Sequence, residues 1–350
     1  MPNSNDTFGE QPKRGFRLPW IKTPEEMEAA RAGKQRADEI RRAELARADI
    51  DFVELARGGI PVSASERLRE IAGAGSAEGV IFTSDLAPEE AGLLRREGYR
   101  PLGLVTGSAV YGVGQAYASA YNDVEVMELS NAYNEAMRLA VARLRLELKQ
   151  IRAHGVVGVR MSLVRHEWAA GTVEVQVVGT AVTGPYPGPD EPWMCDLSAQ
   201  EWWALHRAGY VPTRLVWGHC HWFVLTTQSD EMVHRMFQNI EMGHWSQALK
   251  SARNRALGKV KEQATASKAD GVAGVHIERR LDEIRLTGPG ENPVYEYEHH
   301  NLVISIIGTA IKLRPDAPQY VTATLPVLSL RDGAVNLAPE TIASHDLKVE

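Results

Sequence analysis

The residue types best suited to chemistry come together in the sequence His219-Cys220-His221. If this segment is a β-strand, successive residues point to opposite faces, so the two imidazoles share one face and the Cys220 thiol lies on the other. Imidazole nitrogens are preferred ligands of zinc, copper and nickel, so a divalent transition metal is the candidate cofactor. Eight of the eleven histidines lie between residues 195 and 313, which makes this part of the chain the place to look for further ligands.

A second interpretation of these histidines is structural. Two imidazoles do not make a metal site, and no CxxC or HExxH spacing accompanies them. Six of the eight tryptophans lie between Trp193 and Trp245, and aromatic residues concentrated in this way often form interfaces or cores. Metal ligands and histidines packed on a sheet face or at an interface are therefore both open interpretations.

Catalytic motifs are absent from the sequence. The glycines from Gly107 to Gly112 have the spacing of a phosphate loop, but Val113 and Gly114 follow where Lys and Ser or Thr are needed. The chain also has no GxSxG nucleophile elbow. We therefore favour a protein that is not an enzyme, and keep as an alternative an enzyme whose site is completed by an adjacent subunit.

The composition narrows the range of partners and compartments. The chain has 350 residues, with 39 basic and 45 acidic side chains and a net charge of −6, so a broad surface for nucleic acid is not expected. The longest uncharged run, residues 101–122, contains Gln115, Asn122 and several hydroxyl side chains, so no membrane span is expected either. No leader-like segment follows Met1, and we read Cys195 and Cys220 as thiols of a cytoplasmic protein.

Three colinear sequence matches indicate an internal duplication. The segment beginning SDLAPEEAGLL at Ser84 matches CDLSAQEWWAL at Cys195, an offset of 111 residues. HGVVGVRM at His154 matches DGVAGVHI at Asp270, and VEVQVVGTAV at Val173 matches LVISIIGTAI at residue 302. The offset grows to 116 and then 129 residues, because the second copy carries insertions.

Each copy has the same order of signals, which predicts an α+β fold. A short helix is followed by a β-rich segment, a long helix with one apolar stripe, and two β-branched runs, giving a β-α-β-β unit after the leading helix. The chain therefore divides into a helical arm and linker (residues 1–80), repeat 1 (81–185), repeat 2 (195–313) and an extended tail (314–350). The arm is rich in Ala, Glu and Arg, and we expect a solvated helix that could dock a protein partner.

Copy one resembles the YbjQ-type family of small bacterial proteins, which carry the label of heavy-metal-binding proteins. The resemblance rests on GYRPLGLVTGSAVYG, in which Gly103, Val105, Gly107, Ala109 and Gly112 fit the first strand of the family, followed by a charged helix, GVVGVR and GTAV. It covers residues 83–184 and, more divergently, 195–313.

The resemblance implies dodecin-like domains, each with an antiparallel three-stranded sheet in the order 1-3-2, and assembly into a homo-oligomeric ring, a pentamer of tandem domains. In that order the third strand begins beside the end of the first, so His299 and His300 would lie near His219 and His221. These four histidines are the predicted metal ligands.

The predicted function is that of a non-enzymatic, oligomeric binding or scaffold protein. Heavy-metal binding through the histidines of copy two is the first alternative, and an enzyme with a site shared between subunits is the second. Nothing in the sequence names the ligand.

Overall fold

The computed structural model describes residues 24–73, 83–114, 122–165, 171–185, 190–226, 230, 239–285 and 298–317. The contacts divide the chain into two compact units, residues 1–66 and 67–350. Both sequence repeats therefore lie in one unit. None of the helices in the described ranges is long and apolar enough to cross a bilayer.

The first unit is dominated by one long helix, α1 (Pro24–Ala56), followed by the start of α2 (Val62–Gly73). Almost every described side chain of α1 is exposed, because charged residues surround the helix on all sides. The link between the two helices is held by the Asp51 carboxylate, which accepts a hydrogen bond of 2.6 Å from the Val62 backbone N–H. The predicted solvated helix is confirmed, whereas its role in docking a partner stays a prediction.

The second unit continues with four helices and eight strands among its described residues. Their bounds are α3 (Pro88–Arg96), β1 (Arg100–Gly112), β2 (Val124–Glu125), α4 (Met127–Gln150), β3 (Gly155–Arg165), β4 (Thr172–Thr183), β5 (Trp193–Met194), α5 (Ala199–Arg207), β6 (Tyr210–Val224), α7 (Gly243–Ala266), β7 (Gly271–Arg285) and β8 (Glu298–Leu313).

The strands form two sheets, and the α+β class is confirmed. The order is β1-β4-β3-β5 in the first sheet and β2-β6-β8-β7 in the second, with the three long strands of each sheet antiparallel. The expectation of three strands per sheet needs correction. β2 pairs with β6, and β5 pairs with β3, so each sheet has a fourth, two-residue strand at one edge.

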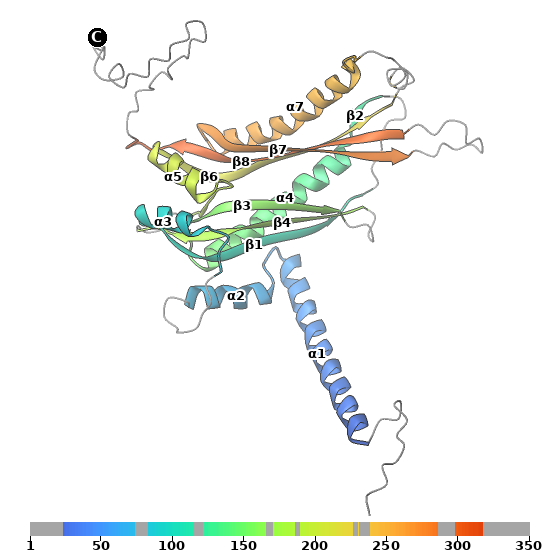
Figure 1. Ribbon diagram of the computed structural model, residues 1–350, viewed down its shortest axis with the longest axis vertical. Helices are drawn as coiled ribbons and strands as arrows, with labels where there is room; N and C mark the ends of the chain where they lie inside the picture. The colour runs from blue at the N-terminus through green and yellow to red at the C-terminus, as the bar shows by residue number, and fades with distance from the viewer. Residues whose placement is uncertain are drawn as a thin grey trace, which may run out of the picture. The chain divides into compact units, whose positions relative to one another are not determined.

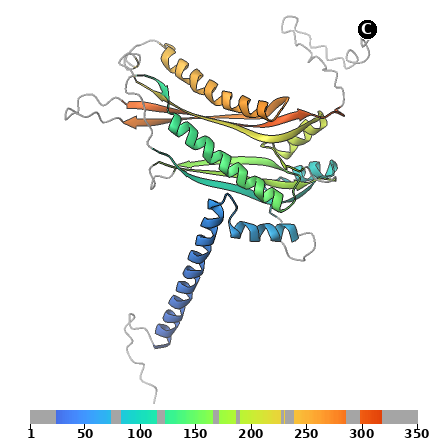
Figure 2. The same cartoon turned by 180° about the vertical axis from the view of Figure 1, so that it is seen from behind.

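The two long helices cover the sheets in the same way. α4 packs on β1 and β4, and α7 packs on β6 and β8. α4 also contacts β6, and Figure 2 shows it running from the edge of the second sheet across the first. Figure 1 shows α7 on the outer side of the second sheet.

Glycine sets the closest helix–sheet contacts in both repeats. A Cβ added at Gly107 would lie 2.1 Å from the Ala140 carbonyl oxygen of α4, and one added at Gly218 would lie 2.1 Å from the Ala256 carbonyl oxygen of α7. Gly158 and Gly274 also occupy matching places, at irregularities of β3 and β7, with φ of +64° in both. The two sequence repeats therefore share the close helix contact at Gly107 and Gly218 and the left-handed backbone at Gly158 and Gly274.

Candidate functional site at the junction of the two repeats

His219 and His221 lie on one face of β6, as the alternation of strand residues predicts, and both are fully buried. His219 Nδ1 is 3.0 Å from Ser305 Oγ, and His221 Nδ1 is 3.0 Å from Asn301 Nδ2, both on the neighbouring strand β8. The ring of Tyr133, from α4, lies 4.3 Å from that of His221 between centroids. The two histidines therefore belong to a buried polar layer between β6, β8 and α4.

His300 lies on the other face of the second sheet. It is opposite Val224 in the β6–β8 register, and Val224 packs in the core beneath α7. Its ring contacts Trp245 of α7, with centroids 5.1 Å apart. The backbone of His299 is in β8, but its side chain is outside the described residues. The structure thus brings together two of the four predicted ligands and turns His300 away from them.

No group of three or more His, Cys, Asp or Glu side chains suited to a metal ion occurs within the described ranges. The pKa of His219 is lowered to about 4, first by burial and then by the positive charge of Lys259, so its ring is neutral at pH 7. Cys220 faces α7, and burial raises the pKa of its thiol to about 12. Cys195 and Cys220 are both free and buried, which confirms the prediction of two thiols.

The outer edge of β6 is covered by residues of the first repeat. The Asn134 amide accepts a hydrogen bond of 3.1 Å from the His219 backbone N–H and donates one of 2.9 Å to the His219 carbonyl. The His221 N–H donates to Ser130 Oγ at 2.9 Å, and its carbonyl accepts from the Val126 N–H at 2.8 Å. A stretch of polar side chains and backbone thus takes the place of a neighbouring strand.

α7 also binds the outer edge of β6, at Trp217, two residues before His219. Gln263 of α7 donates a hydrogen bond of 2.6 Å to the Trp217 carbonyl and accepts one of 3.3 Å from its N–H. The matching residue of the first repeat is Glu147, which accepts from the Thr106 N–H at 2.8 Å. Burial raises the pKa of Glu147, although Arg67 of α2 forms an ion pair of 2.7 Å with it. In both repeats, therefore, the long helix holds the edge strand through one side chain.

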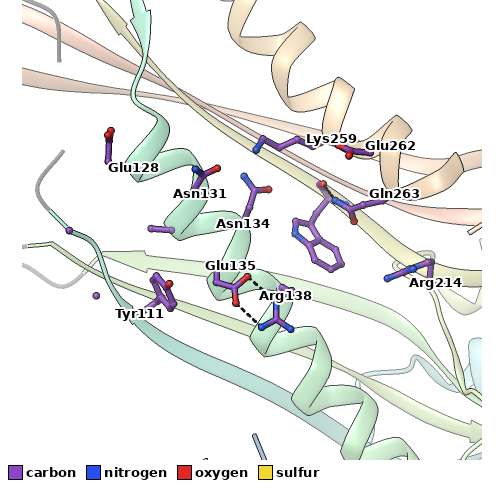
Figure 3. Close-up of a pocket in the computed structure, with 14 residues that line it drawn as sticks. Tyr111, Glu128, Asn131, Asn134, Glu135, Arg138, Arg214, Lys259, Glu262 and Gln263 are labelled. Atoms are coloured by element: carbon purple, nitrogen blue, oxygen red, sulfur yellow. Dashed lines mark hydrogen bonds and ion pairs between the residues drawn. The ribbon is translucent and has the colours of Figure 1, made fainter. Parts of the chain in front are cut away.

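A cavity of about 780 Å³ lies beside this edge, between α4 and the second repeat. Figure 3 shows side chains of α4 on one side and those of β6 and α7 on the other. Three carboxylates and three cations line it, namely Glu128, Glu135, Glu262, Arg138, Arg214 and Lys259. Arg138 and Glu135 are joined by hydrogen bonds of 2.6 and 2.8 Å, which lower the pKa of Glu135 and raise that of Arg138. This charge balance favours neither anions nor cations as ligands.

Comparison with known proteins gives one informative relative. No family model and no solved structure matches the chain. The chain is 32% identical over 202 residues to the encapsulin nanocompartment protein Rv1762c of Mycobacterium tuberculosis (strain ATCC 25618 / H37Rv), covering 56% of this chain and 77% of the relative.

The chain belongs to the family of this nanocompartment protein.

The predicted YbjQ-type family is therefore wrong. The chain belongs to the nanocompartment-protein family, and no comparison supports a relationship to YbjQ-type proteins. The glycine-rich strand that carried the resemblance has a structural cause. Gly107 lies directly under the backbone of α4. A Cβ added at Gly103 would lie 3.2 Å from the side chain of Ile71 of α2. Any strand crossed so closely by helices needs small residues, so this pattern identifies a packing geometry rather than a family.

The sequence did not reveal the residues that join the repeats in this member of the nanocompartment-protein family. Ser130 and Asn134 are one helical turn apart on α4, and their partners lie more than eighty residues further along the chain. The available signal was the presence of two polar residues on the side of the helix that carries the buried apolar stripe.

Proposed function

We propose that the protein is a non-enzymatic, self-assembling structural component of an encapsulin nanocompartment. The observation that carries this proposal is the relationship to the encapsulin nanocompartment protein Rv1762c. The balanced charges of the 780 Å³ cavity also support a structural role, because they offer no concentrated charge for a substrate.

The proposal is tested with the full chain, carrying an affinity tag, in the cells that produce it. We expect the chain to sediment with large protein particles on a density gradient and to form defined oligomers when purified. A chain that sediments only as a free monomer at every concentration would overturn the proposal. We expect five chains per oligomer, and the molecular mass of the purified oligomer measures this number.

Metal binding by His219, His221, His299 and His300 stays a prediction. The shared face of His219 and His221 supports it, but a metal ion held there would need ligands other than His300, which lies on the opposite face. Elemental analysis of the purified chain and of a His219→Ala/His221→Ala variant measures this directly. A bound metal that is lost in the variant is the expected result, and equal metal content in both proteins would reject the site.

A further inference from the structure

The junction between the two repeats provides a template for a contact between two copies of the chain. Residues 123–134 run along the outer edge of β6, where Val124 pairs with Phe223 and Glu125 with Trp222. The Asp123 carboxylate also accepts a hydrogen bond of 2.9 Å from the Leu225 N–H. This segment of the first repeat thus continues the second sheet by strand pairing and then by side-chain hydrogen bonds.

The second repeat carries a copy of the same segment. DVEVMELS, starting at Asp123, corresponds to NIEMGHWS, starting at Asn239, with an identical Glu at the third position and an identical Ser at the eighth. The residues before the two helices also share a backbone conformation, with φ −82° and ψ 86° at Val126 and φ −80° and ψ 87° at Met242. The two copies therefore enter their long helices with the same backbone conformation.

The exposure of the two segments differs in the way expected if the second one lacks its partner. Ser130 is fully buried, whereas Ser246 is exposed. Ile240 takes the place of Val124 and is 53% exposed, although it is a β-branched residue suited to strand pairing. Among the described residues, no strand pairs with this segment.

A matching acceptor is present in the first repeat. β1 corresponds to β6, and in the described part of the chain no strand pairs with its outer edge. Side chains already bond to the earlier part of this edge: Arg67 of α2 donates to the Leu104 carbonyl at 2.7 Å, and on α4 Glu147 accepts from the Thr106 N–H at 2.8 Å and Arg143 donates to the Ser108 carbonyl at 2.5 Å. The part of the edge offered to a second copy therefore lies beyond Ser108. Val110, which corresponds to His221, is 63% exposed. An exposed strand edge of this kind readily accepts another chain segment.

We infer that two copies of the chain join head to tail, with residues 239–250 of one copy lying along β1 of the next. This inference rests on the proposed self-assembly and names its interface. By correspondence with the internal junction, Ile240 pairs with Gly112 of the neighbouring copy, and Ser246 Oγ accepts from the Val110 N–H. Each chain offers one donor segment and one acceptor edge, so the assembly is a closed ring or an open filament in which first and second repeats alternate.

The first test breaks the interface from each side. Ile240→Lys places a charge in the donor segment, and Val110→Pro removes an N–H from the outer edge of β1 without touching its bonds to β4. Ile277→Lys is the matched control, because Ile277 is 46% exposed on β7, away from both segments. Sedimentation velocity over a dilution series should show dissociation constants raised at least tenfold in the first two variants and unchanged in the control, with circular dichroism unchanged in all three.

The second test is a cross-link between separate chains. Ile240→Cys and Gly112→Cys variants are prepared singly, and the native thiols are buried and do not compete. Mixing the two should give a disulfide-linked dimer on oxidation, whereas neither variant alone should give one. If the Ile240→Lys and Val110→Pro variants form oligomers as stable as those of the wild type, and the mixture gives no cross-link, this interface is wrong although the chain still self-assembles. A wild-type chain that is monomeric would instead overturn the proposed function.

Discussion

At the scale of single residues, His219 couples the stability of the junction to pH. Its pKa is about 4 in the folded chain and about 6.5 in an unfolded one, so the unfolded state takes up the proton first as the pH falls. We expect the free energy of unfolding to decrease by about 3 kcal/mol between pH 7 and pH 4 through this group, since each pKa unit corresponds to about 1.4 kcal/mol.

Urea titrations of the wild type and of His219→Gln at several pH values measure this effect. The variant lacks the titrating ring, so its loss of stability towards acid should be smaller by that amount. His276→Gln, at an exposed histidine, should follow the wild type. Parallel pH profiles for the wild type and His219→Gln would contradict the prediction.

Asp196 has the opposite dependence on pH. Burial raises the pKa of its carboxyl to about 6, although the Thr309 hydroxyl donates a hydrogen bond to it. The folded state therefore holds a proton that the unfolded state releases near pH 4, and stability decreases as the pH rises from about 4 to 6. Asp196→Asn keeps an oxygen that accepts from Thr309 and removes the charge. It should be more stable than the wild type by about 3 kcal/mol at pH 7 and by less than about 1 kcal/mol at pH 4.

Thermal unfolding at the two pH values provides the measurement. Asp85→Asn is the matched control, because Asp85 occupies the same place in the first repeat and is more exposed. An Asp196→Asn variant that is less stable than the wild type at pH 7 would show that the carboxylate is favourable in the folded state.

At the scale of helices and strands, the close crossing of α4 over β1 depends on Gly107. A Cβ there would meet backbone atoms of α4, the Ala140 carbonyl oxygen at 2.1 Å and the Leu144 nitrogen at 2.6 Å, so the helix must move away. We expect Gly107→Ala to destabilise the fold by about 2 kcal/mol. Gly258→Ala, on α7 with no neighbouring atom within 4 Å of the added Cβ, should be neutral or slightly stabilising. Denaturant titration compares the two.

The long elements could be predicted from the sequence, but their neighbours could not. The apolar stripes of α4 and α7 and the β-branched runs of the strands have clear periods, so their type and order follow from the residues. β2 and β5 have two residues each and no period, and they exist only because a partner strand lies beside them. The α+β class was therefore predictable, and the fourth strand of each sheet was not.

The site shows the same difference between local and long-range information. The shared face of His219 and His221 follows from the alternation along one strand. The face of His300 depends on the register between β6 and β8, which pairs it with Val224 and is fixed by contacts across more than seventy residues of chain. The roles of Ser130 and Asn134 depend in the same way on which strand edge α4 meets.

At the scale of the whole molecule, the two repeats should unfold as one cooperative unit. The first repeat supplies β2 and the Asn134 amide to the second sheet. β5, directly before the second repeat, pairs with β3, and Cys195 of the second repeat adds backbone hydrogen bonds to Val156 and Val159 of β3. Neither sheet has its full set of edge partners without the other repeat, and one hydrophobic core cluster joins Leu94 and Val157 of the first repeat to Cys195 and Trp202 of the second. Loss of one repeat would therefore remove hydrogen-bond partners from the other, at a net cost of about 0.5–1.5 kcal/mol for each bond replaced by water.

Hydrogen exchange of the full chain tests this cooperativity, because the slowest amides exchange through global unfolding. Gly107→Ala perturbs only the first repeat directly, yet it should accelerate the slowest amides of β4 and β8 by the same factor. A destabilisation of about 2 kcal/mol corresponds to about thirtyfold faster exchange, since a tenfold change in an equilibrium constant is about 1.4 kcal/mol. If exchange in β4 accelerates while β8 keeps its protection, the repeats unfold independently, and the contacts of β2, β5 and Asn134 are too weak to couple them.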